Sequence, residues 1–357
     1  MERIIKTFIL KHSVADIPVL AILLILMVNR GYAQEVSIKS VRLMFYNVEN
    51  LFDIYNDTSK DDDDFTPKGL LRWNETRYKK KISAVYKTVI AAGDWTPPEI
   101  VAFCEVENRN VLEDLVYGTY LTKYNYRIIH EESPDQRGID VCMIYRKEFI
   151  SIIEYTYWIP SGIAQEMFTS RSVLYTKFLC GGDTLHLIVN HWPSRRGGVL
   201  TGESIRLNIS SMIREKVDSI NRETTGGAKI IILGDFNCSP ADQEMESLTA
   251  PSESGRVLVN LSEKKADEGV GTYRYMGTWE MIDQVLVSEK LLSCNAGLYT
   301  DLDQATVFRP DFLLVKDQKY PGFTPYSTYR GYRYQGGFSD HLPILLNLKE
   351  RDVAWQE

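Results

Sequence analysis

The sequence lacks the cysteine pattern of a disulfide-stabilised or zinc-binding protein. Its 357 residues include only five cysteines, which are widely separated and mostly lie inside apolar runs: Cys104, Cys142, Cys180, Cys238 and Cys294. An odd number of cysteines at these spacings forms neither a disulfide framework nor a metal-binding motif. We therefore expect buried free thiols, with one incidental disulfide as the alternative.

The chain also lacks net positive charge. It carries 41 basic and 48 acidic residues, for a formal net charge of −7. An acidic protein has no general electrostatic attraction to nucleic acid or to anionic membranes. This charge argues against a protein that coats DNA. It is compatible with an enzyme that meets phosphate through a local cation and a few arginines.

The one long apolar run lies in the first 33 residues. Three basic residues precede an apolar stretch from Ile17 to Val28, and Gly31 and Ala33 follow it. This order predicts a cleaved secretory signal peptide over residues 1–33, because the stretch is shorter than the ~20 residues that span a bilayer. An uncleaved membrane anchor is the alternative. Cleavage would leave residues 34–357, with net charge −9, as a periplasmic or secreted protein without a membrane span.

Internal repeats and linkers rich in proline, serine or glycine are absent as well, so residues 34–357 are expected to form a single domain. Helical spacing of apolar residues predicts long helices over 75–92 and 202–221 and a short one over 111–116. Strands are predicted over 36–48, 100–104, 126–130, 141–145, 152–158, 173–180, 185–189, 229–233, 285–287, 312–315 and 344–348. Many strands in local hairpins, interrupted by two long helices, indicate an α+β fold with two packed sheets and helices outside.

One loop has an unusual concentration of acid. Residues 56–68 contain four consecutive aspartates, from Asp61 to Asp64, and we interpret the segment as a solvated loop. A run of aspartates can bind calcium, but the alternating spacing of a calcium-binding loop is missing.

Short polar segments follow or interrupt several of the predicted buried strands. They cover residues 45–50, 103–108, 190–194, 233–237, 281–284 and 337–343. Polar side chains at the ends of neighbouring strands point into a shared cleft at the sheet edge. Such a cleft, rich in oxygen and imidazole groups, suits a hard divalent cation and a phosphate. The series therefore indicates metal-assisted phosphoester chemistry.

Two of these segments contain candidate catalytic acids. Glu105 ends an apolar strand and is the best candidate for a metal ligand, with an ordinary surface turn residue as the alternative. Asp235 and Asn237 are two residues apart, so in an extended segment both face the same side. Such a pair can take a proton from water and bind the resulting anion. The alternative is a turn cap, since Asp and Asn are common in turns.

The histidines provide the next signal. Asp283 lies between apolar residues, where an unpaired carboxylate is costly. Pairing with His341 would satisfy both groups, orient the ring and raise the imidazole pKa. His191 also follows an apolar strand. A lone histidine is more often structural, but the chain has only five, and two of them lie in such segments.

The order of these segments resembles the endonuclease/exonuclease/phosphatase superfamily, which contains deoxyribonuclease I, exonuclease III and the neutral sphingomyelinases. The match runs from Asn47 to His341, and its most specific pieces are residues 234–237 and 339–341. The resemblance implies an α+β, four-layered α/β/β/α sandwich of two mostly antiparallel sheets flanked by helices. It also implies phosphoester hydrolysis assisted by Mg²⁺ or Mn²⁺.

The resemblance further implies roles for individual residues. Glu105 is similar to the family's main metal ligand, assisted by Asn47 and Asp340. Asp235 corresponds to the group that orients or deprotonates water, with Asn237 beside it.

The remaining roles concern the substrate phosphate. His341 with Asp283 resembles the pair that contacts the scissile phosphate, and His191 resembles the second histidine of the deoxyribonuclease and sphingomyelinase branches. Arg171 matches a phosphate-binding arginine, and Asn237 is likewise expected to contact the phosphate. Asp140 lies where the family approaches the cleft.

The resulting functional prediction is an exported, metal-dependent nuclease that acts on DNA or RNA, without a stable protein partner. Aromatic residues from Tyr326 to Tyr334, with Arg330 and Arg333, would stack bases and hold phosphate. A mobile surface loop is the alternative there. Trp192 would line the cleft or pack beneath it.

Three other functions remain open. A lipid phosphodiesterase is disfavoured because no apolar hairpin follows the signal segment. An inositol-phosphate phosphatase usually continues Asn-Tyr-Arg after its Gly-Asp segment, whereas this chain reads Asn237-Cys238-Ser239. An inactive binding module on the same fold would have lost polar residues that are all present here.

Overall fold

The computed structural model describes residues 40–160, 170–195, 199–251, 255 and 258–351. The predicted signal segment, residues 1–33, lies outside the described residues, as do residues 36–39 of the first predicted strand. No helix among the described residues is long and apolar enough to cross a membrane. All five cysteines are free and buried, as the sequence predicts.

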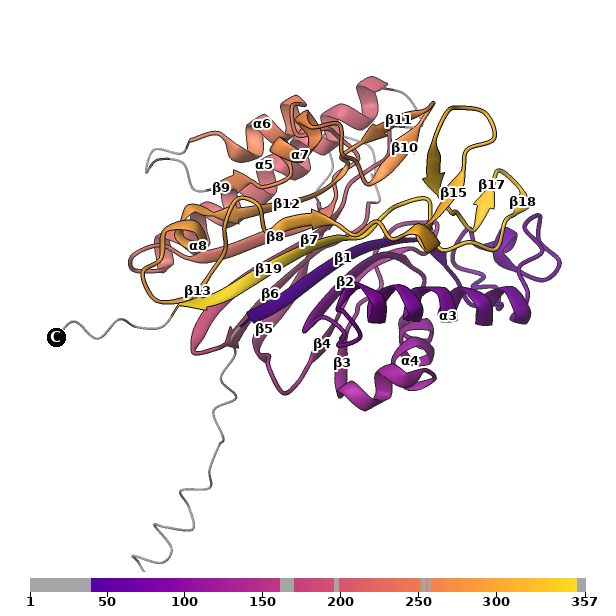
Figure 1. Ribbon diagram of the computed structural model, residues 1–357, viewed down its shortest axis with the longest axis horizontal. Helices are drawn as coiled ribbons and strands as arrows, with labels where there is room; N and C mark the ends of the chain where they lie inside the picture. The colour runs from indigo at the N-terminus through magenta and orange to yellow at the C-terminus, as the bar shows by residue number, and fades with distance from the viewer. Residues whose placement is uncertain (1–39, 161–169, 196–198, 252–254, 256–257, 352–357) are drawn as a thin grey trace, which may run out of the picture. The chain divides into compact units, whose positions relative to one another are not determined.

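Two sheets form the centre of the fold (Figure 1). The first contains β1 (Ser40–Leu51), β2 (Ile100–Val106), β3 (Tyr126–Ile129), β4 (Asp140–Arg146), β13 (Gly297–Tyr299), β14 (Ala305–Val307) and β19 (Ile344–Arg351). Its strand order is β13-β19-β1-β2-β4-β3, and β14 also pairs with β19. The second contains β5 (Ser151–Trp158), β6 (Val173–Cys180), β7 (Asp183–His191), β8 (Lys229–Asp235), β9 (Leu258–Asn260) and β12 (Asp283–Ser288), in the order β5-β6-β7-β8-β12-β9. Both sheets are mostly antiparallel, and each has one parallel pair, β1 with β2 and β7 with β8.

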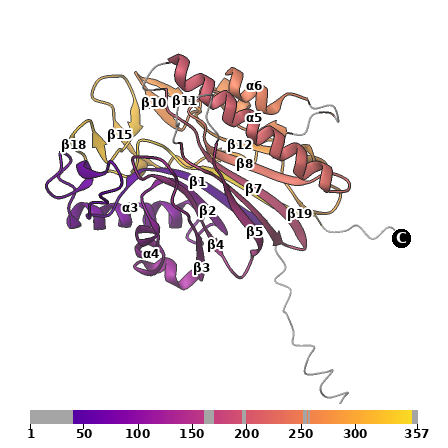
Figure 2. The same ribbon diagram turned by 180° about the vertical axis from the view of Figure 1, so that it is seen from behind.

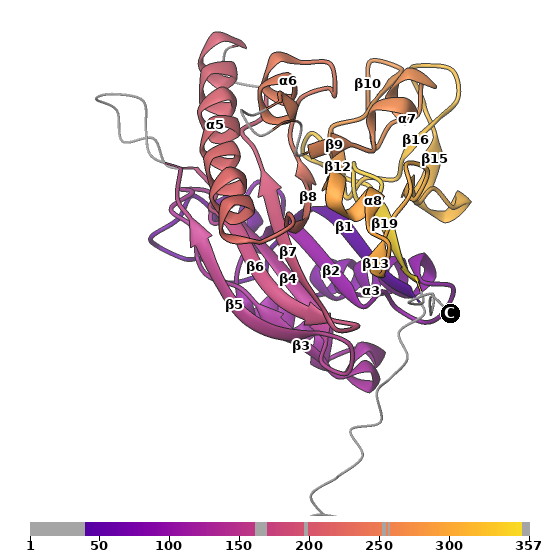
Figure 3. The ribbon, with the colours of Figure 1, turned by 90° about the vertical axis from the view of Figure 1, so that its left-hand side faces the viewer.

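Helices cover the outer faces of both sheets (Figure 2). On the first sheet lie α3 (Glu75–Ala92) and α4 (Arg109–Tyr117). The 3-10 helix η1 (Asp63–Phe65) precedes α3 in the sequence, and the 3-10 helix η2 (Tyr120–Tyr124) follows α4. On the second lie α5 (Val199–Glu223) and α6 (Gln243–Thr249), which share the side of the domain that faces away from β1 and β2 (Figure 3). The shorter elements are α7 (Glu263–Asp267), α8 (Glu289–Ser293) and η3 (Asp311–Leu313).

Strand alternation explains the layering. Along β1, Leu43 and Phe45 belong to the core between the two sheets, whereas Met44 and Tyr46 pack with residues of α3 and α4. Successive side chains of a strand point to opposite faces, so this strand is apolar on both sides and buried by a sheet on one face and helices on the other. The predicted α/β/β/α sandwich is therefore confirmed.

Local sequence signals account for the helix boundaries. The Asn74 side chain accepts a hydrogen bond from the backbone N–H of Arg77 at 3.2 Å, which caps α3 at its start, and Gly93 follows the last residue. Capping by Asn and termination at Gly are what the sequence predicts there.

The predicted strand over 312–315 is wrong in its first half. The chain forms η3 directly after Pro310, and β15 begins only at Leu314.

Three two-stranded hairpins lie together at one end of the sandwich (Figures 1 and 2). They are β10–β11 (Tyr273–Tyr275 and Thr278–Glu280), β15–β16 (Leu314–Lys316 and Phe323–Pro325) and β17–β18 (Tyr329–Arg330 and Arg333–Tyr334). Their strands are two or three residues long, too short for an alternating pattern to show in the sequence. Only the second half of the predicted 312–315 strand corresponds to any of them.

Gly234 makes a close approach between β8 and β7 possible. Its φ is +155°, and an added Cβ would lie 2.3 Å from the carbonyl oxygen of Asn190. The Cβ would be attached to the backbone of β8, and the carbonyl oxygen belongs to the backbone of β7. Because the sheet holds both backbones, neither atom can move away without breaking the strand pairing. We expect Gly234→Ala to destabilise the fold by about 3 kcal/mol, measured by urea unfolding.

Gly182 provides a matched control for that substitution. It also has a positive φ, +80°, but nothing lies within 4 Å of an added Cβ. Gly182→Ala should therefore cost only about 1 kcal/mol, from backbone strain. Equal effects of the two substitutions would contradict the steric explanation.

Candidate active site

The polar segments predicted from the sequence meet at one edge of the two sheets. Each contributes a side chain from the end of a strand, namely Asn47 from β1, Glu105 from β2, His191 from β7, Asp235 from β8, Asp283 from β12 and His341 from just before β19. Direct contacts link members of the first sheet to members of the second. The sandwich therefore brings together groups that are up to about 300 residues apart in the chain.

Backbone irregularities expose the carboxylates of the first sheet. The pairing of β2 shifts register between Cys104 and Val106, and Glu105 between them has φ +61°. In β1 a second shift coincides with Glu49 and Asn50, whose φ values are +51° and +58°. A non-glycine residue with positive φ is costly and concentrates at functional sites. These bulges turn side chains away from the regular strand alternation and toward the edge.

Asn47 joins the two sheets through its side-chain amide. Its Nδ2 donates to Oε1 of Glu105 at 3.2 Å and to Oδ2 of Asp235 at 3.0 Å. Its Oδ1 accepts from the backbone N–H of Glu49 at 2.9 Å. The second oxygen of Glu105 accepts from the backbone N–H of Asn50 at 3.0 Å. One amide therefore fixes two carboxylates that come from different sheets.

The predicted pair of Asp283 and His341 is present. Nδ1 of His341 lies 2.7 Å from Oδ2 of Asp283, and its Nε2 faces Oδ2 of Asp235 at 3.9 Å. Burial alone would lower the pKa of His341, but the charge and hydrogen bond of Asp283 and the charges of Asp235 and Asp340 raise it well above its ordinary value. The ring is therefore a cation that presents Nε2–H to the centre.

Asp235 occupies the middle of the cluster. Burial and the nearby charge of Asp283 raise the pKa of its carboxyl group to about 7, against the opposing effect of His341. A carboxyl group with a pKa near neutrality is well suited to exchange a proton with water.

Asn237 differs from its predicted geometry. The strand ends at Asp235, and Asn237 has φ +50°, so the two do not lie along one extended segment. The backbone N–H of Asn237 donates to Oδ1 of Asp235 at 2.9 Å, and its Nδ2 donates to the carbonyl of Trp192 at 3.0 Å. The prediction of two side chains on one face of a strand is therefore wrong, because the turn-forming tendency of Asn prevailed. Asn237 still shapes the site, by holding Asp235.

Arg171 and His191 form the basic side of the centre. Nε and Nη2 of Arg171 lie 3.3 and 3.1 Å from the two ring nitrogens of His191. Nε2 of His191 is 3.7 Å from both Glu105 and Asp235. Burial first, and then the positive charge of Arg171, lower the pKa of His191 well below its ordinary value. His191 is therefore neutral, whereas His341 is charged.

A second network beside Asp340 was missed by the sequence analysis. The buried Lys81 of α3 donates to the hydroxyl of Thr328 at 2.5 Å and to the carbonyl of Phe338 at 2.6 Å. Burial, together with the charge of Asp340, raises the pKa of Glu49 to about 7, and Lys81 opposes that rise. Lys81 is three residues after Tyr78 and four before Val85, so the sequence places it on the apolar face of its helix. That spacing was the sequence signal that could have identified Lys81 as a buried lysine.

The donor set fits a divalent cation. Carboxylates outnumber cationic groups in this part of the structure, since five acids accompany three charged bases: Glu49, Glu105, Asp235, Asp283 and Asp340 against Lys81, Arg171 and His341. Burial and the charge of Glu105 raise the pKa of Asp340, against the effect of His341. One oxygen of Asp283, Oδ1, is buried without a hydrogen-bond partner among the described residues. A hard cation with oxygen ligands relieves such an excess of negative charge.

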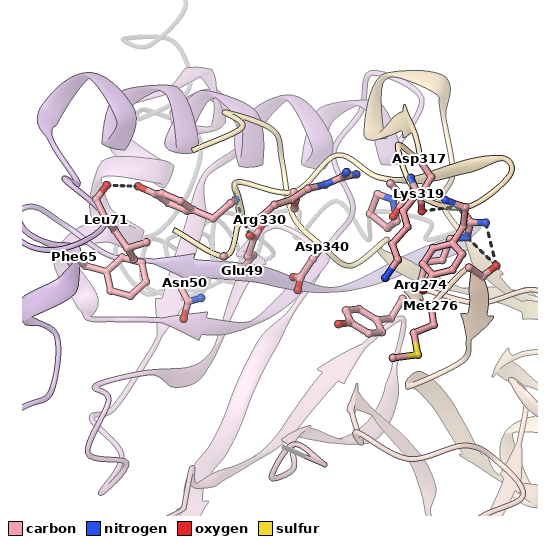
Figure 4. A pocket seen from close by; sticks show the side chains of 18 residues that line it. Glu49, Asn50, Phe65, Leu71, Arg274, Met276, Asp317, Lys319, Arg330 and Asp340 are labelled. Atoms are coloured by element: carbon pink, nitrogen blue, oxygen red, sulfur yellow. Dashed lines mark hydrogen bonds and ion pairs between the residues drawn. The ribbon is translucent and has the colours of Figure 1, made fainter. Parts of the chain in front are cut away.

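A groove lies next to this centre, lined by Asp340 and by residues of all three hairpins (Figure 4). Its volume is about 500 Å³, and Asp340 and Glu49 line it together with Lys319 and Arg330. Met276 also lines it from the tip of β10–β11, where it is 63% exposed and has φ +47°. An extended groove with exposed cations and an apolar side chain has room for more than an inorganic phosphate.

The aromatic segment from Tyr326 to Tyr334 does not form a stack of free rings. Tyr329 packs against Trp73, and its hydroxyl donates to the carbonyl of Leu71 at 3.0 Å. Tyr334 lies under the guanidinium of Arg77. Tyr329 and Tyr334 therefore anchor the hairpin to the segment from Leu71 to Arg77, and the prediction of base stacking is wrong for these two rings. Tyr332, by contrast, is 71% exposed. Arg330 and Arg333 remain exposed.

Two further candidates lie away from the reactive groups. Trp192 is fully buried and packs edge-on against Phe236, so it is a core residue and does not line the groove. Asp140 accepts from the backbone N–H of Ser133 at 2.8 Å and pairs with His130 at 2.9 Å. The structure therefore does not bring Asp140 to the centre.

Comparison with known proteins agrees with this geometry. The family model described as "Endonuclease/Exonuclease/phosphatase family" matches residues 42–350. No curated protein matches the chain significantly in sequence. The chain belongs to the endonuclease/exonuclease/phosphatase family, and it is therefore a phosphoesterase by fold and family.

Solved structures share the fold at low identity. A family member from Bacteroides thetaiotaomicron is 16% identical, with a TM-score of 0.54 and coverage of 88% of this chain and 98% of its own. The human Nocturnin catalytic domain with bound sulfate is 14% identical, with a TM-score of 0.53 and coverage of 88% and 97%. D. rerio TDP2 complexed with single-strand DNA product is 14% identical, with a TM-score of 0.52 and coverage of 87% and 100%.

Proposed function

We propose that this chain is an exported nuclease that hydrolyses phosphodiester bonds of DNA or RNA with the help of a divalent cation, Mg²⁺ or Mn²⁺. The observation that carries the nucleic-acid assignment is the groove of about 500 Å³ that leads away from Asp340. Its lining includes the exposed cations Lys319 and Arg330, beside Arg274 paired with Asp317 and the acids Glu49 and Asp340, in a chain whose net charge is negative. Local cations in an acidic protein mark the place where a polyanion binds.

Glu105, Asn47 and Asp340 would hold the cation. Glu105 and Asp340 offer carboxylate oxygens, and Asn47 would use Oδ1. When bound, the cation supplies Lewis-acid stabilisation of charge on the phosphate oxygens. Glu105 is held for this role by Asn47 and by the backbone N–H of Asn50, so its orientation does not depend on the substrate.

Asp235 would orient the attacking water and accept its proton. Its carboxyl pKa of about 7 permits this near neutral pH. Asn47 and the backbone N–H of Asn237 fix its two oxygens, so the carboxylate cannot rotate away. This preorganisation keeps the water in line with the phosphorus as the ester bond breaks.

Two basic groups would bind the phosphate, with His191 beside them. Protonated His341 donates Nε2–H to a non-bridging oxygen, where negative charge increases in the transition state. Asp283 keeps that ring charged and oriented. Arg171 supplies a second fixed positive charge, and neutral His191 lies between it and the carboxylates.

A substrate panel tests this proposal. Residues 34–357 would be incubated with plasmid DNA, single-stranded DNA, RNA, sphingomyelin and bis-p-nitrophenyl phosphate, with Mg²⁺, Mn²⁺ or EDTA. We expect metal-dependent cleavage of nucleic acid. Cleavage of sphingomyelin alone would instead assign a lipid phosphodiesterase, which the exposed side chains of Met276 and Phe323 would then contact. No turnover of any substrate would favour an inactive binding module.

The export part of the proposal has its own test. It rests on the basic start and apolar run of residues 1–33. The full-length chain with a C-terminal tag would be expressed and the cells fractionated. Recovery outside the cytoplasm with a new N-terminus near residue 34 is expected. Recovery in the cytoplasm with an intact leader would contradict export.

A further inference from the structure

A second arginine lies beside the basic side of the catalytic centre. It is Arg137, in the loop between β3 and β4. Oδ1 of Asp135 accepts hydrogen bonds from the backbone N–H of Arg137 at 2.9 Å and from its Nε at 3.4 Å. The other oxygen of the same carboxylate, Oδ2, lies 3.5 Å from Nε of Arg171. One aspartate therefore holds two guanidinium groups next to each other, and one of them belongs to the catalytic centre.

The two arginines differ in their access to solvent. Arg171 and Asp135 are each 6% exposed, whereas the side chain of Arg137 is 51% exposed. Within the described part of the chain, Nε is the one guanidinium nitrogen of Arg137 that has a hydrogen-bond partner. Both Nη atoms are therefore available to a ligand. An exposed arginine is ordinarily solvated, so it is the link through Asp135 to the catalytic centre that distinguishes Arg137.

The charge of Arg137 acts on groups inside the centre. Burial lowers the pKa of Arg171, and the positive charge of Arg137 lowers it further. Burial and the charge of Arg171 lower the pKa of His191, and Arg137 adds to that effect. Because the attraction or repulsion between charges falls with distance, Arg137 is close enough to act on a phosphate chain bound at the centre.

The loop that carries Arg137 is fixed by its own hydrogen bonds. The backbone N–H of Asp135 donates to Oγ of Ser133 at 3.3 Å. The carbonyl of Asp135 accepts from the backbone N–H of Gly138 at 3.1 Å and from Nζ of Lys60 at 3.0 Å. Gly138 has φ +64°, which glycine adopts without strain. The main chain at Arg137 is therefore ordered before a ligand binds, which lowers the entropic cost of binding.

We propose that Arg137 binds a second phosphate of the substrate, next to the scissile phosphate that Arg171 contacts. The inference rests on the proposed nuclease function and names the feature of the substrate that this subsite selects. Arg137 does not line the groove next to Asp340, so its phosphate belongs to a different part of the strand from the part in that groove. A polynucleotide has such a second phosphate, whereas a phosphodiester with a single phosphate does not.

The chemistry of Arg137 suits binding and not the chemical step. A guanidinium is always charged and can donate two parallel N–H bonds to phosphate oxygens. Asp135 occupies only Nε, so both Nη atoms can donate. A contact with a phosphate that does not react is equally strong in the ground state and the transition state. Its loss therefore raises KM and leaves kcat unchanged.

Steady-state kinetics of Arg137→Gln test this proposal, using residues 34–357 with Mg²⁺. On a short single-stranded DNA, KM should rise ~10-fold while kcat stays the same. On bis-p-nitrophenyl phosphate, which has one phosphate, both constants should be unchanged. Arg137→Lys keeps the charge and should recover most of the KM for DNA.

The salt dependence of kcat/KM on DNA provides an independent readout. Each phosphate contact to a single strand contributes about 0.7 to the slope of log affinity against log salt concentration. Arg137→Gln should therefore reduce that slope by about 0.7. A role of Arg137 in the structure of its loop alone would leave the slope unchanged.

Arg222→Gln is the matched control. Arg222 is exposed in the last turn of α5. The next residue, Glu223, lines a pocket with Asp183, which begins β7, whereas His191 ends that strand. Arg222 therefore lies at the end of the second sheet that is opposite to the catalytic centre. Its replacement should change neither KM nor the salt slope.

The outcomes separate this inference from the nuclease assignment. If the wild type cleaves DNA and Arg137→Gln has the same KM and salt slope, the inference is overturned and the nuclease assignment stands. Equal losses on DNA and on bis-p-nitrophenyl phosphate would also overturn it, because Arg137 would then act on the scissile phosphate or on the fold. If the wild type cleaves no nucleic acid, the proposed function fails, and this inference fails with it.

Discussion

Asp235→Asn should reduce kcat by about 10³-fold while making the metal-free protein more stable. The amide cannot accept a proton from water, so the chemical step loses its base. The same carboxyl group is buried next to Asp283, which raises its pKa to about 7. A carboxylic acid whose pKa is raised on folding destabilises the fold once it ionises. Above pH 7, in EDTA, the variant should therefore melt at a higher temperature than the wild type.

The matched control for this prediction is Asp218→Asn. Asp218 lies on α5, where it pairs with Arg214 one helical turn away. Its replacement should leave kcat unchanged and leave stability nearly so, since partly exposed pairs of this kind contribute little. A loss of activity in Asp235→Asn that is accompanied by a lower melting temperature would indicate structural damage and would contradict a catalytic role.

Asp283→Asn should have the second largest effect, with a loss of about 10²–10³-fold in kcat. Asp283 raises the pKa of His341 well above its ordinary value by charge and by a 2.7 Å hydrogen bond. Without that carboxylate, burial dominates and the imidazole pKa falls. The ring then becomes neutral at a lower pH, and the phosphate loses its protonated donor.

The titration of His341 can be followed directly by NMR in EDTA-treated protein. The wild-type ring should remain protonated well above the ordinary histidine range, and in Asp283→Asn its midpoint should shift to lower pH. His186 is an internal reference, because its pKa, lowered to about 4 by burial and by Lys177, does not depend on Asp283. An unchanged His341 titration in the variant would show that Asp283 does not control this histidine.

Much of the fold could be predicted because its signals are local. The helix from Glu75 to Ala92 has a cap, an apolar face and a terminal glycine within one segment. The strand from Val173 to Cys180 is a compact apolar run before a Gly-Gly turn. The short hairpins at the groove could not be predicted in this way, because strands of two or three residues carry no periodicity of their own.

The candidate site shows the same division between local and distant causes. The pairing of Asp283 with His341 could be predicted, because a carboxylate in an apolar segment requires a partner and His341 lies in another polar segment at a strand boundary. The contact of His191 with Arg171 and the burial of Lys81 depend on tertiary packing.

The most direct test of the central claim is the metal dependence of hydrolysis at Glu105. Residues 34–357 and the Glu105→Gln variant would be compared on single-stranded DNA and on bis-p-nitrophenyl phosphate, with Mg²⁺ titrated into EDTA-treated protein. The account predicts that the wild type gains activity on adding Mg²⁺, and that Glu105→Gln loses at least ~10³-fold in kcat/KM while remaining folded. Hydrolysis that persists in EDTA, or a Glu105→Gln variant as active as the wild type, would contradict it.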